Sequence, residues 1–131
     1  MKVPEGLHYS REHEWVRVDG DTAVVGITDY AQDALGDLVY VQLPEVGVSV
    51  KATETCCEIE STKSVSEIYA PVSGTVAEVN SALIDTPEQV NTDPYGEGWI
   101  FKLTVSDPAE FDALLDASTY TALTEEASDQ P

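Results

Sequence analysis

Apolar and polar residues alternate in short runs along most of the chain, which is the period of half-buried β-strands. Residues 14–18 and 22–27 form two such runs, and the turn signal Asp19-Gly20-Asp21 between them predicts a β-hairpin. Further runs of this kind are residues 38–43, 55–60, 65–70, 75–79 and 99–105. Many short strands at close spacing predict a mainly β fold, a small antiparallel barrel or sandwich.

Helical signals are confined to one internal segment and the C-terminal part of the chain. Thr28-Asp29 offers an N-cap for one or two helical turns over residues 30–35, which Gly36 closes. Asp107-Pro108 places an N-cap before a proline at the first helical position, which predicts a helix over 109–115. The sequence therefore predicts a short internal helix and C-terminal helices.

The remaining segments complete the expected organisation. Residues 80–98 are predicted to be mostly loop, because proline and glycine punctuate them. A second C-terminal helix is expected over 117–124, and residues 125–131 are expected to fray. With 131 residues, 42% of them hydrophobic, the chain is expected to form a single domain over residues 1–131.

The chain is strongly acidic, with 25 Asp and Glu against 6 Lys and Arg and a net charge of −19. This charge argues against nucleic acid and anionic membrane surfaces as partners. Either it steers basic proteins to the chain, or it only confers solubility. No segment resembles a signal peptide, a transit sequence or a membrane span. We therefore expect a soluble protein of the bacterial cytoplasm, or of the mitochondrial matrix if this is a processed form.

Lys63 lies between two strand signals, at the expected tip of a hairpin over about 55–70. A hairpin tip exposes an amine at a fixed place, and the small neighbours Ser61, Thr62 and Ser64 leave room for a modifying enzyme. The carboxylates of nearby glutamates favour the charged amine, so Lys63 is a poor candidate for a nucleophilic catalyst. Two interpretations follow, a site of covalent modification or a plain solvated lysine in an acidic binding module.

The two cysteines, Cys56 and Cys57, are adjacent. Neighbouring residues on a strand point to opposite faces, and a disulfide between them would close a strained ring. His8 and His13 have no companion ligands at metal-binding spacing, so no metal site is predicted. We expect two reduced thiols, at least one of them packed inside.

A series of motifs between residues 7 and about 105 resembles the H-protein family of the glycine cleavage system. The matching segments are His13-Glu14-Trp15-Val16, Gly26-Ile27-Thr28-Asp29-Tyr30-Ala31-Gln32, Leu35-Gly36-Asp37, Val41-Gln42-Leu43-Pro44, Glu60-Ser61-Thr62-Lys63-Ser64, Tyr69-Ala70-Pro71-Val72-Ser73-Gly74, Glu78-Val79-Asn80 and Asn91-Thr92-Asp93-Pro94-Tyr95-Gly96 leading to Gly98-Trp99. In this order and at these spacings the motifs are specific.

The resemblance implies a barrel-sandwich hybrid of the lipoyl/biotinyl kind, with lipoate in amide linkage to Lys63. Glu60, Ser61, Thr62 and Ser64 would form the modification motif. Such a carrier has no active site of its own. It shuttles an aminomethyl group from the glycine decarboxylase (P protein) to the aminomethyltransferase (T protein), and electrons to dihydrolipoyl dehydrogenase (L protein). Lipoate-attaching enzymes are further implied partners.

The resemblance also implies a surface cleft into which the loaded arm folds, near His13, Glu14 and Glu67. A carboxylate there would pair with the cationic amine. Two departures from the family pattern lie on the approach to the hairpin. Thr53 stands where glycine is frequent, and Cys56-Cys57 replaces the common Phe-Gly, so the strand is expected to follow a slightly different path.

Other lysine-modified carriers remain as alternatives. Biotinyl domains usually flank their lysine with methionine, whereas Thr62 and Ser64 flank it here. The lipoyl domains of 2-oxo acid dehydrogenases are shorter and lack the His13-to-Trp15 and Asp93-to-Trp99 segments. A lipoate relay is harder to separate, because relay and carrier can share one surface.

Overall fold

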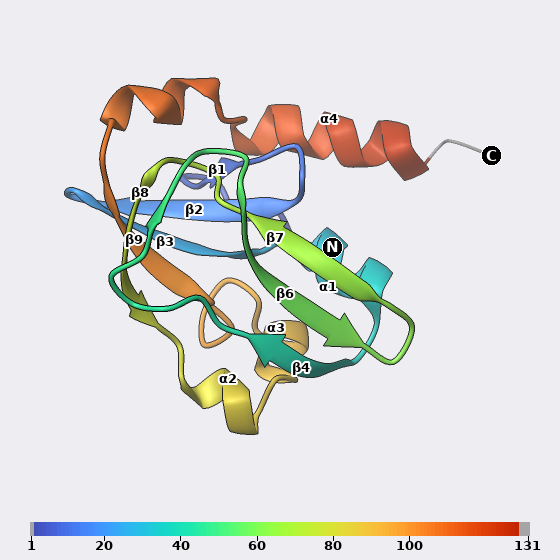
Figure 1. Cartoon of the computed structure of the whole chain (residues 1–131). Coiled ribbons are helices and arrows are strands. Elements are labelled where there is room, and N and C mark those ends of the chain that lie inside the picture. Colours follow the sequence, from blue (N-terminus) through green and yellow to red (C-terminus); the bar gives the residue numbers. More distant parts are fainter. Residues whose placement is uncertain (1, 129–131) are drawn as a thin grey trace.

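The computed structural model describes residues 2–128, with side chains as far as Glu125. Nine strands form two antiparallel sheets (Figure 1). The six-stranded sheet has the order β1-β2-β3-β9-β8-β5 and the three-stranded sheet the order β4-β6-β7. The strands are β1 (His8–Tyr9), β2 (Glu14–Asp19), β3 (Thr22–Ile27), β4 (Leu38–Gln42), β5 (Ser49–Val50), β6 (Thr55–Ser61), β7 (Val65–Tyr69), β8 (Gly74–Val79) and β9 (Phe101–Val105). The mainly β, antiparallel class predicted from the alternation is confirmed.

The main core lies between the two sheets, because alternate residues of each strand point inward. In the small sheet the paired residues Val41 and Ile59 are almost fully buried, while the next pair, Tyr40 and Glu60, faces outward. The large sheet contributes, among others, Phe101 from β9. This alternation leaves the outer face of the β4-β6-β7 sheet open to solvent along the whole hairpin.

The internal helix α1 (Asp29–Leu35) forms as its flanking residues predict. The Thr28 hydroxyl caps it by accepting a hydrogen bond from the Ala31 backbone N–H at 3.2 Å. Gly36 ends it with a φ of +83°, a conformation that favours glycine. This end of α1 lies beside the tip of the β6-β7 hairpin (Figure 1).

Several predicted boundaries are corrected by the structure. Residues 80–98 are mostly turn and loop, as predicted, but they also contain α2 (Ala82–Asp85) and α3 (Gln89–Thr92), which were not predicted. Each has only four residues, too few to show a helical period in the sequence. The two-residue strands β1 and β5 escaped prediction for the same reason.

The C-terminal segment also differs in detail. Asp107 caps its helix as predicted, but the helix is the 3₁₀ segment η1 (Pro108–Ala113), which ends before Leu114. The final helix, α4 (Ala117–Ser128), continues past residue 124, where frayed chain was expected. Residues 129–131 of the predicted tail lie outside the described residues. Within the described part, no helix is long and apolar enough to cross a membrane.

A second, smaller cluster packs α4 against the outer side of β1 and β2. Its centre is Tyr9, Trp15, Val24 and Tyr120. The rings of Tyr9 and Tyr120 stack at 4.7 Å, and the Trp15 indole N–H donates to the Pro94 carbonyl at 2.9 Å. Trp15 fits only because its cross-strand neighbour is Gly26.

The contact between Trp15 and Gly26 gives a direct test of the packing. A Cβ added at Gly26 would lie 2.7 Å from the indole ring, so Gly26→Ala should lower the free energy of unfolding by about 2 kcal/mol. Urea denaturation measures this. The same substitution in a Trp15→Phe background should cost less, because the smaller ring relieves the clash. Equal costs in both backgrounds would contradict the packing.

Candidate functional site

The tip of the β6-β7 hairpin is organised by one hydroxyl group. The Ser61 side chain accepts hydrogen bonds from the backbone N–H groups of Lys63 and Ser64, both at 3.1 Å. The Ser61 backbone N–H donates to the Ser64 carbonyl at 2.8 Å, and the Thr62 N–H donates to the Asp37 carbonyl at 3.1 Å. Hydrogen bonds inside the turn therefore fix the shape of the tip, and one further hydrogen bond ties it to the loop after α1.

Lys63 is exposed at this tip. Among the side chains described, those of residues 2–125, the one salt bridge joins Lys102 and Glu78, so the Lys63 amine has no ion-pair partner among them. Its side chain lies against Gly36, where an added Cβ would come 3.3 Å from the Lys63 Cε. The absence of a side chain at Gly36 thus leaves room for the lysine stem. An exposed, unpaired amine on a fixed turn fits amide attachment of a long group.

Carboxylates gather on the outer face of the same sheet. Glu60 pairs across the strands with Tyr40 and Val65, and Glu58 pairs with Gln42 and Glu67. Directly paired residues share a face of the sheet, so Glu58, Glu60 and Glu67 all point away from the core. Acylation of Lys63 would remove the positive charge beside them and make this face more negative.

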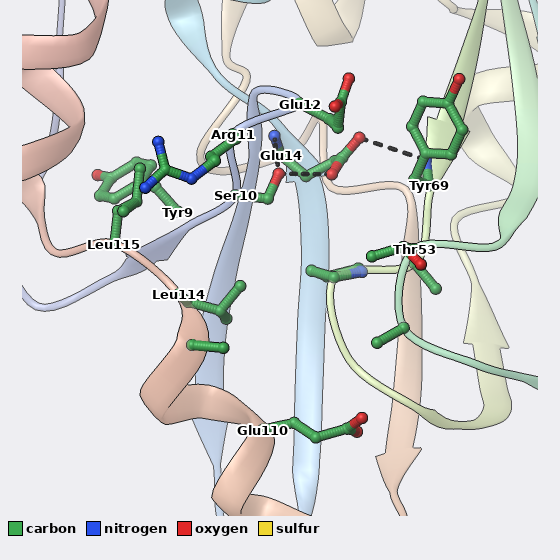
Figure 2. Close-up of a pocket in the computed structure, with 14 residues that line it drawn as sticks. Tyr9, Ser10, Arg11, Glu12, Glu14, Thr53, Tyr69, Glu110, Leu114 and Leu115 are labelled. Carbon is green, nitrogen blue, oxygen red and sulfur yellow. Dashed lines mark hydrogen bonds between the residues drawn. The ribbon is translucent and has the colours of Figure 1, made fainter.

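A pocket of about 540 Å³ lies beyond the other end of β7 (Figure 2). Its walls are the start of β2, the turn before β6, the end of β7 and the region of η1. The lining residues are Tyr9, Ser10, Arg11, Glu12, Glu14, Ala52, Thr53, Tyr69, Ala70, Pro71, Glu110, Ala113, Leu114 and Leu115. Eight of the fourteen are apolar or aromatic; of the carboxylates, Glu12 and Glu14 lie near each other, and Glu110 lies apart on η1 (Figure 2).

Glu14 is the most unusual of the lining residues, because its carboxylate is almost fully buried, with 2% of the residue exposed. It accepts hydrogen bonds from the Ser10 hydroxyl at 2.5 Å and from the Tyr69 backbone N–H at 3.3 Å (Figure 2). Burial raises the pKa of Glu14 to about 7, against the lowering effect of these two hydrogen bonds. Figure 2 shows Arg11, the basic residue of the lining, directed away from Glu14 toward Leu115.

The structure separates the three residues expected at the cleft. Glu14 lines the pocket, whereas Glu67 lies outside it and accepts a hydrogen bond from the Tyr69 hydroxyl at 3.2 Å. His13 faces α4 instead, with its Nδ1 2.7 Å from the Tyr120 hydroxyl. Burial lowers the pKa of His13, so its neutral form is favoured.

Sequence reasoning missed several residues that line the pocket with Glu14. Tyr69 and Ser10 supply the hydrogen bonds to Glu14, but their roles depend on how β1, β2 and β7 approach one another. Glu110 comes from η1, far along the chain, and no sequence signal connected it to this site. A signal did exist for Thr53, since it occupies a position where the resemblance expects glycine.

The cysteines lie at a β-bulge. Thr55 pairs with Tyr69 and Cys57 with Ile68, so Cys56 is an extra residue in β6. Both thiols are free; Cys57 is buried and Cys56 half-buried, as predicted. They line a smaller pocket of about 300 Å³. No group of three potential metal ligands occurs in the part of the chain that the structure describes.

Comparison with known proteins decides the family. The sequence model described as "Glycine cleavage H-protein" matches residues 7–127. The chain belongs to the glycine cleavage H-protein family. This family consists of lipoate-bearing carriers, so the resemblance read from the motifs is confirmed.

Individual H-proteins agree with this assignment over nearly their full length. The glycine cleavage system H protein of Symbiobacterium thermophilum is 57% identical over 124 residues, which cover 95% of this chain and 97% of that protein. The Thermus thermophilus protein is 56% identical over 125 residues, covering 95% and 98%. A crystal structure of the Mycobacterium marinum H protein has a TM-score of 0.86 at 46% identity, covering 94% of this chain and 99% of that one. The expected barrel-sandwich fold is thereby confirmed.

The buried carboxyl group of Glu14 predicts a pH-dependent stability. Its pKa of about 7 in the folded chain lies above the value of 4.5 for an unperturbed Glu, so the folded state holds the proton more tightly between these values. The free energy of unfolding should therefore fall by about 3 kcal/mol as pH rises from about 4.5 to 7. Urea denaturation across this range should show that fall in the wild type.

The matched variants assign the effect to Glu14. Glu14→Gln should remove most of this fall, whereas Glu97→Gln, at an exposed position, should keep it because Glu14 is intact. A fall of the same size in Glu14→Gln and wild type would show that other groups cause it.

Proposed function

We propose that the chain is the lipoyl carrier of a glycine cleavage system, a single carrier domain with lipoate in amide linkage to Lys63. The observation that carries this proposal is the Lys63 tip itself. The amine is exposed, has no ion-pair partner among the described residues, and projects from a turn that Ser61 holds by two hydrogen bonds. The gap at Gly36 accommodates the lysine stem.

The proposed partners are the P, T and L proteins of the system and the enzymes that attach lipoate. When attached, lipoate supplies a dithiolane that accepts an aminomethyl group and carries electrons. The chain itself performs no catalysis in this proposal. Its contribution is to hold the arm at a fixed place, which raises the effective concentration of the arm at each docked partner.

Partner recognition is assigned to the outer face of the β4-β6-β7 sheet. Glu58, Glu60 and Glu67 lie on this face beside the arm, within a chain of net charge −19. Partners with basic docking surfaces would be steered to it, and the rate of encounter would fall with salt. The bacterial relatives favour a cytoplasmic location for this assembly.

The pocket at Glu14 is proposed as the resting place of the arm when it carries a terminal ammonium. β7 spans about 13 Å between Val65 and Tyr69, at about 3.3 Å per residue, and so leads from the Lys63 tip to the pocket. The ammonium would pair with the Glu14 carboxylate and hold it ionised, because an adjacent positive charge lowers a carboxyl pKa. The apolar walls would exclude water from the labile amine.

Intact-mass spectrometry of the chain from its native host tests the attachment. The mass should exceed the sequence mass by one lipoyl group, located at Lys63 by peptide mapping. Lys63→Arg should abolish the adduct, because a guanidinium cannot form the amide, whereas Lys51→Arg should retain it. A biotinyl mass, or an unmodified Lys63, would contradict the proposal. Reconstitution with the P, T and L proteins then separates a cleavage carrier from a lipoate relay.

The release of formaldehyde from aminomethyl-loaded protein tests the role of Glu14. Glu14→Gln should speed the release about tenfold, because the ammonium loses a charge-assisted hydrogen bond. Glu67→Gln should have a smaller effect on the release. Glu67 lies outside the pocket and contacts its lining through the Tyr69 hydroxyl. Glu97→Gln is the control. An unchanged rate in Glu14→Gln would remove this residue from the site.

A further inference from the structure

Thr53 has a backbone conformation that threonine rarely adopts. It is the third residue of the turn from Lys51 to Glu54, which the Glu54 N–H closes by donating to the Lys51 carbonyl at 3.0 Å. Its φ is +74°, whereas Ala52 before it is not in the positive region. This is the pattern of a type II turn, whose third position normally requires glycine or asparagine. A β-branched residue there is an outlier that calls for a reason.

The surrounding contacts force this conformation on Thr53. The Thr53 N–H donates to the Ala70 carbonyl and the Ala70 N–H donates to the Glu54 carbonyl, both at 2.8 Å. On the preceding residue, the Ala52 N–H donates to the Ser73 hydroxyl at 2.9 Å. The turn is thus tied to the segment that follows β7, and the position of Thr53 is determined from both sides.

A further carboxylate fixes this segment to the opposite wall of the pocket. Glu110 of η1 accepts hydrogen bonds from the Ser73 N–H at 2.8 Å and from the Ser73 hydroxyl at 3.0 Å. Thr53 therefore sits in a wall braced by two other chain segments. Backbone strain held in this way is a feature of ligand sites rather than of free turns.

The strained turn places Thr53 in the lining of the same pocket as Glu14 and Tyr69 (Figure 2). Among the described residues, the Thr53 hydroxyl has no hydrogen-bond partner. Glycine would satisfy the turn without strain but would supply no hydroxyl. Thr53 is exposed at the wall of the pocket, so its hydroxyl is accessible to a ligand there, at a cost in backbone energy.

The hydrogen-bonding capacity of Glu14 bears on the role of the Thr53 hydroxyl. A primary ammonium has three N–H donors. Both oxygens of Glu14 already accept one hydrogen bond each, from Ser10 and from Tyr69. An ammonium beside Glu14 therefore uses further acceptors from the wall, and the Glu12 carboxylate and the Thr53 hydroxyl, both in the lining, can supply them.

We propose that the Thr53 hydroxyl is a second binding group for the terminal ammonium of the arm, which it holds together with Glu14. This inference rests on the proposed function, because it assigns a residue to the same pocket. It explains why threonine is retained at a turn position that favours glycine. Thr53 acts here by binding the resting arm and takes no part in a chemical step.

Three substitutions of the full-length chain separate the hydroxyl from the strain. In aminomethyl-loaded protein, Thr53→Ala and Thr53→Gly should release formaldehyde about tenfold faster than wild type, as expected for loss of one hydrogen bond to a charged group. Thr53→Ser should decay as slowly as wild type, because it keeps the hydroxyl. Thr53→Gly should also raise the Tm of the unlipoylated chain by a few degrees, since it relieves the positive φ.

A second readout does not depend on the loaded arm. Methylammonium titrated into the unlipoylated chain, and followed through the carboxyl carbon resonance of Glu14, should bind about tenfold more weakly to Thr53→Ala than to wild type. Thr53→Ser should bind it as wild type does. These comparisons use variants that leave Glu14 in place.

The outcomes distinguish this inference from the proposed function. If wild-type protein protects the loaded arm and Thr53→Ala protects it equally, the inference is overturned and the pocket role stands. Equal methylammonium binding by wild type and Thr53→Ala overturns it as well. If wild-type protein releases formaldehyde as fast as free aminomethyl-dihydrolipoamide, the pocket role itself fails.

Discussion

The antiparallel pairing of β6 with β7 fixes the distance between the two halves of the site. Lys63 lies at one end of β7 and Tyr69 at the other, and the backbone N–H of Tyr69 reaches Glu14 on β2. A slip of one residue in this register would turn Glu60 into the core and Ile59 outward. The buried pair of Val41 and Ile59 prevents such a slip, so hydrophobic packing sets the distance between the Lys63 tip and the pocket.

The electrostatics of the two halves differ because their burial differs. Glu58, Glu60 and Glu67 lie on the outer face of the sheet, where water and salt screen them, and they contribute a field rather than a tight contact. Glu14 is enclosed, and burial raises the pKa of its carboxyl group to about 7. A positive charge inside the pocket would therefore favour its ionised form. The arm would supply that charge only when its end carries the amine, so the pocket would prefer the loaded arm over the unloaded one.

Sequence patterns predicted the hairpin that bears Lys63 but missed most residues that line the pocket at Glu14. The alternation around Lys63 is local, and a hairpin brings together residues that are near in sequence. Glu14, Thr53, Tyr69 and Glu110 instead come from four separate segments, whose meeting depends on the packing of both sheets and η1. His13 shows that neighbours in sequence need not share a site. It lies between Glu12 and Glu14, which line the pocket, but its backbone has a φ of +70° and its side chain faces Tyr120.

In the proposed function, the arm on Lys63 reaches from the hairpin tip to the pocket at Glu14. Nuclear Overhauser contacts from a ¹³C-labelled aminomethyl group on the lipoylated chain test it most directly. We predict contacts from this group to Tyr69 and Leu114, which line the pocket. Contacts only to residues of the tip, such as Thr62 and Ser64, would contradict it.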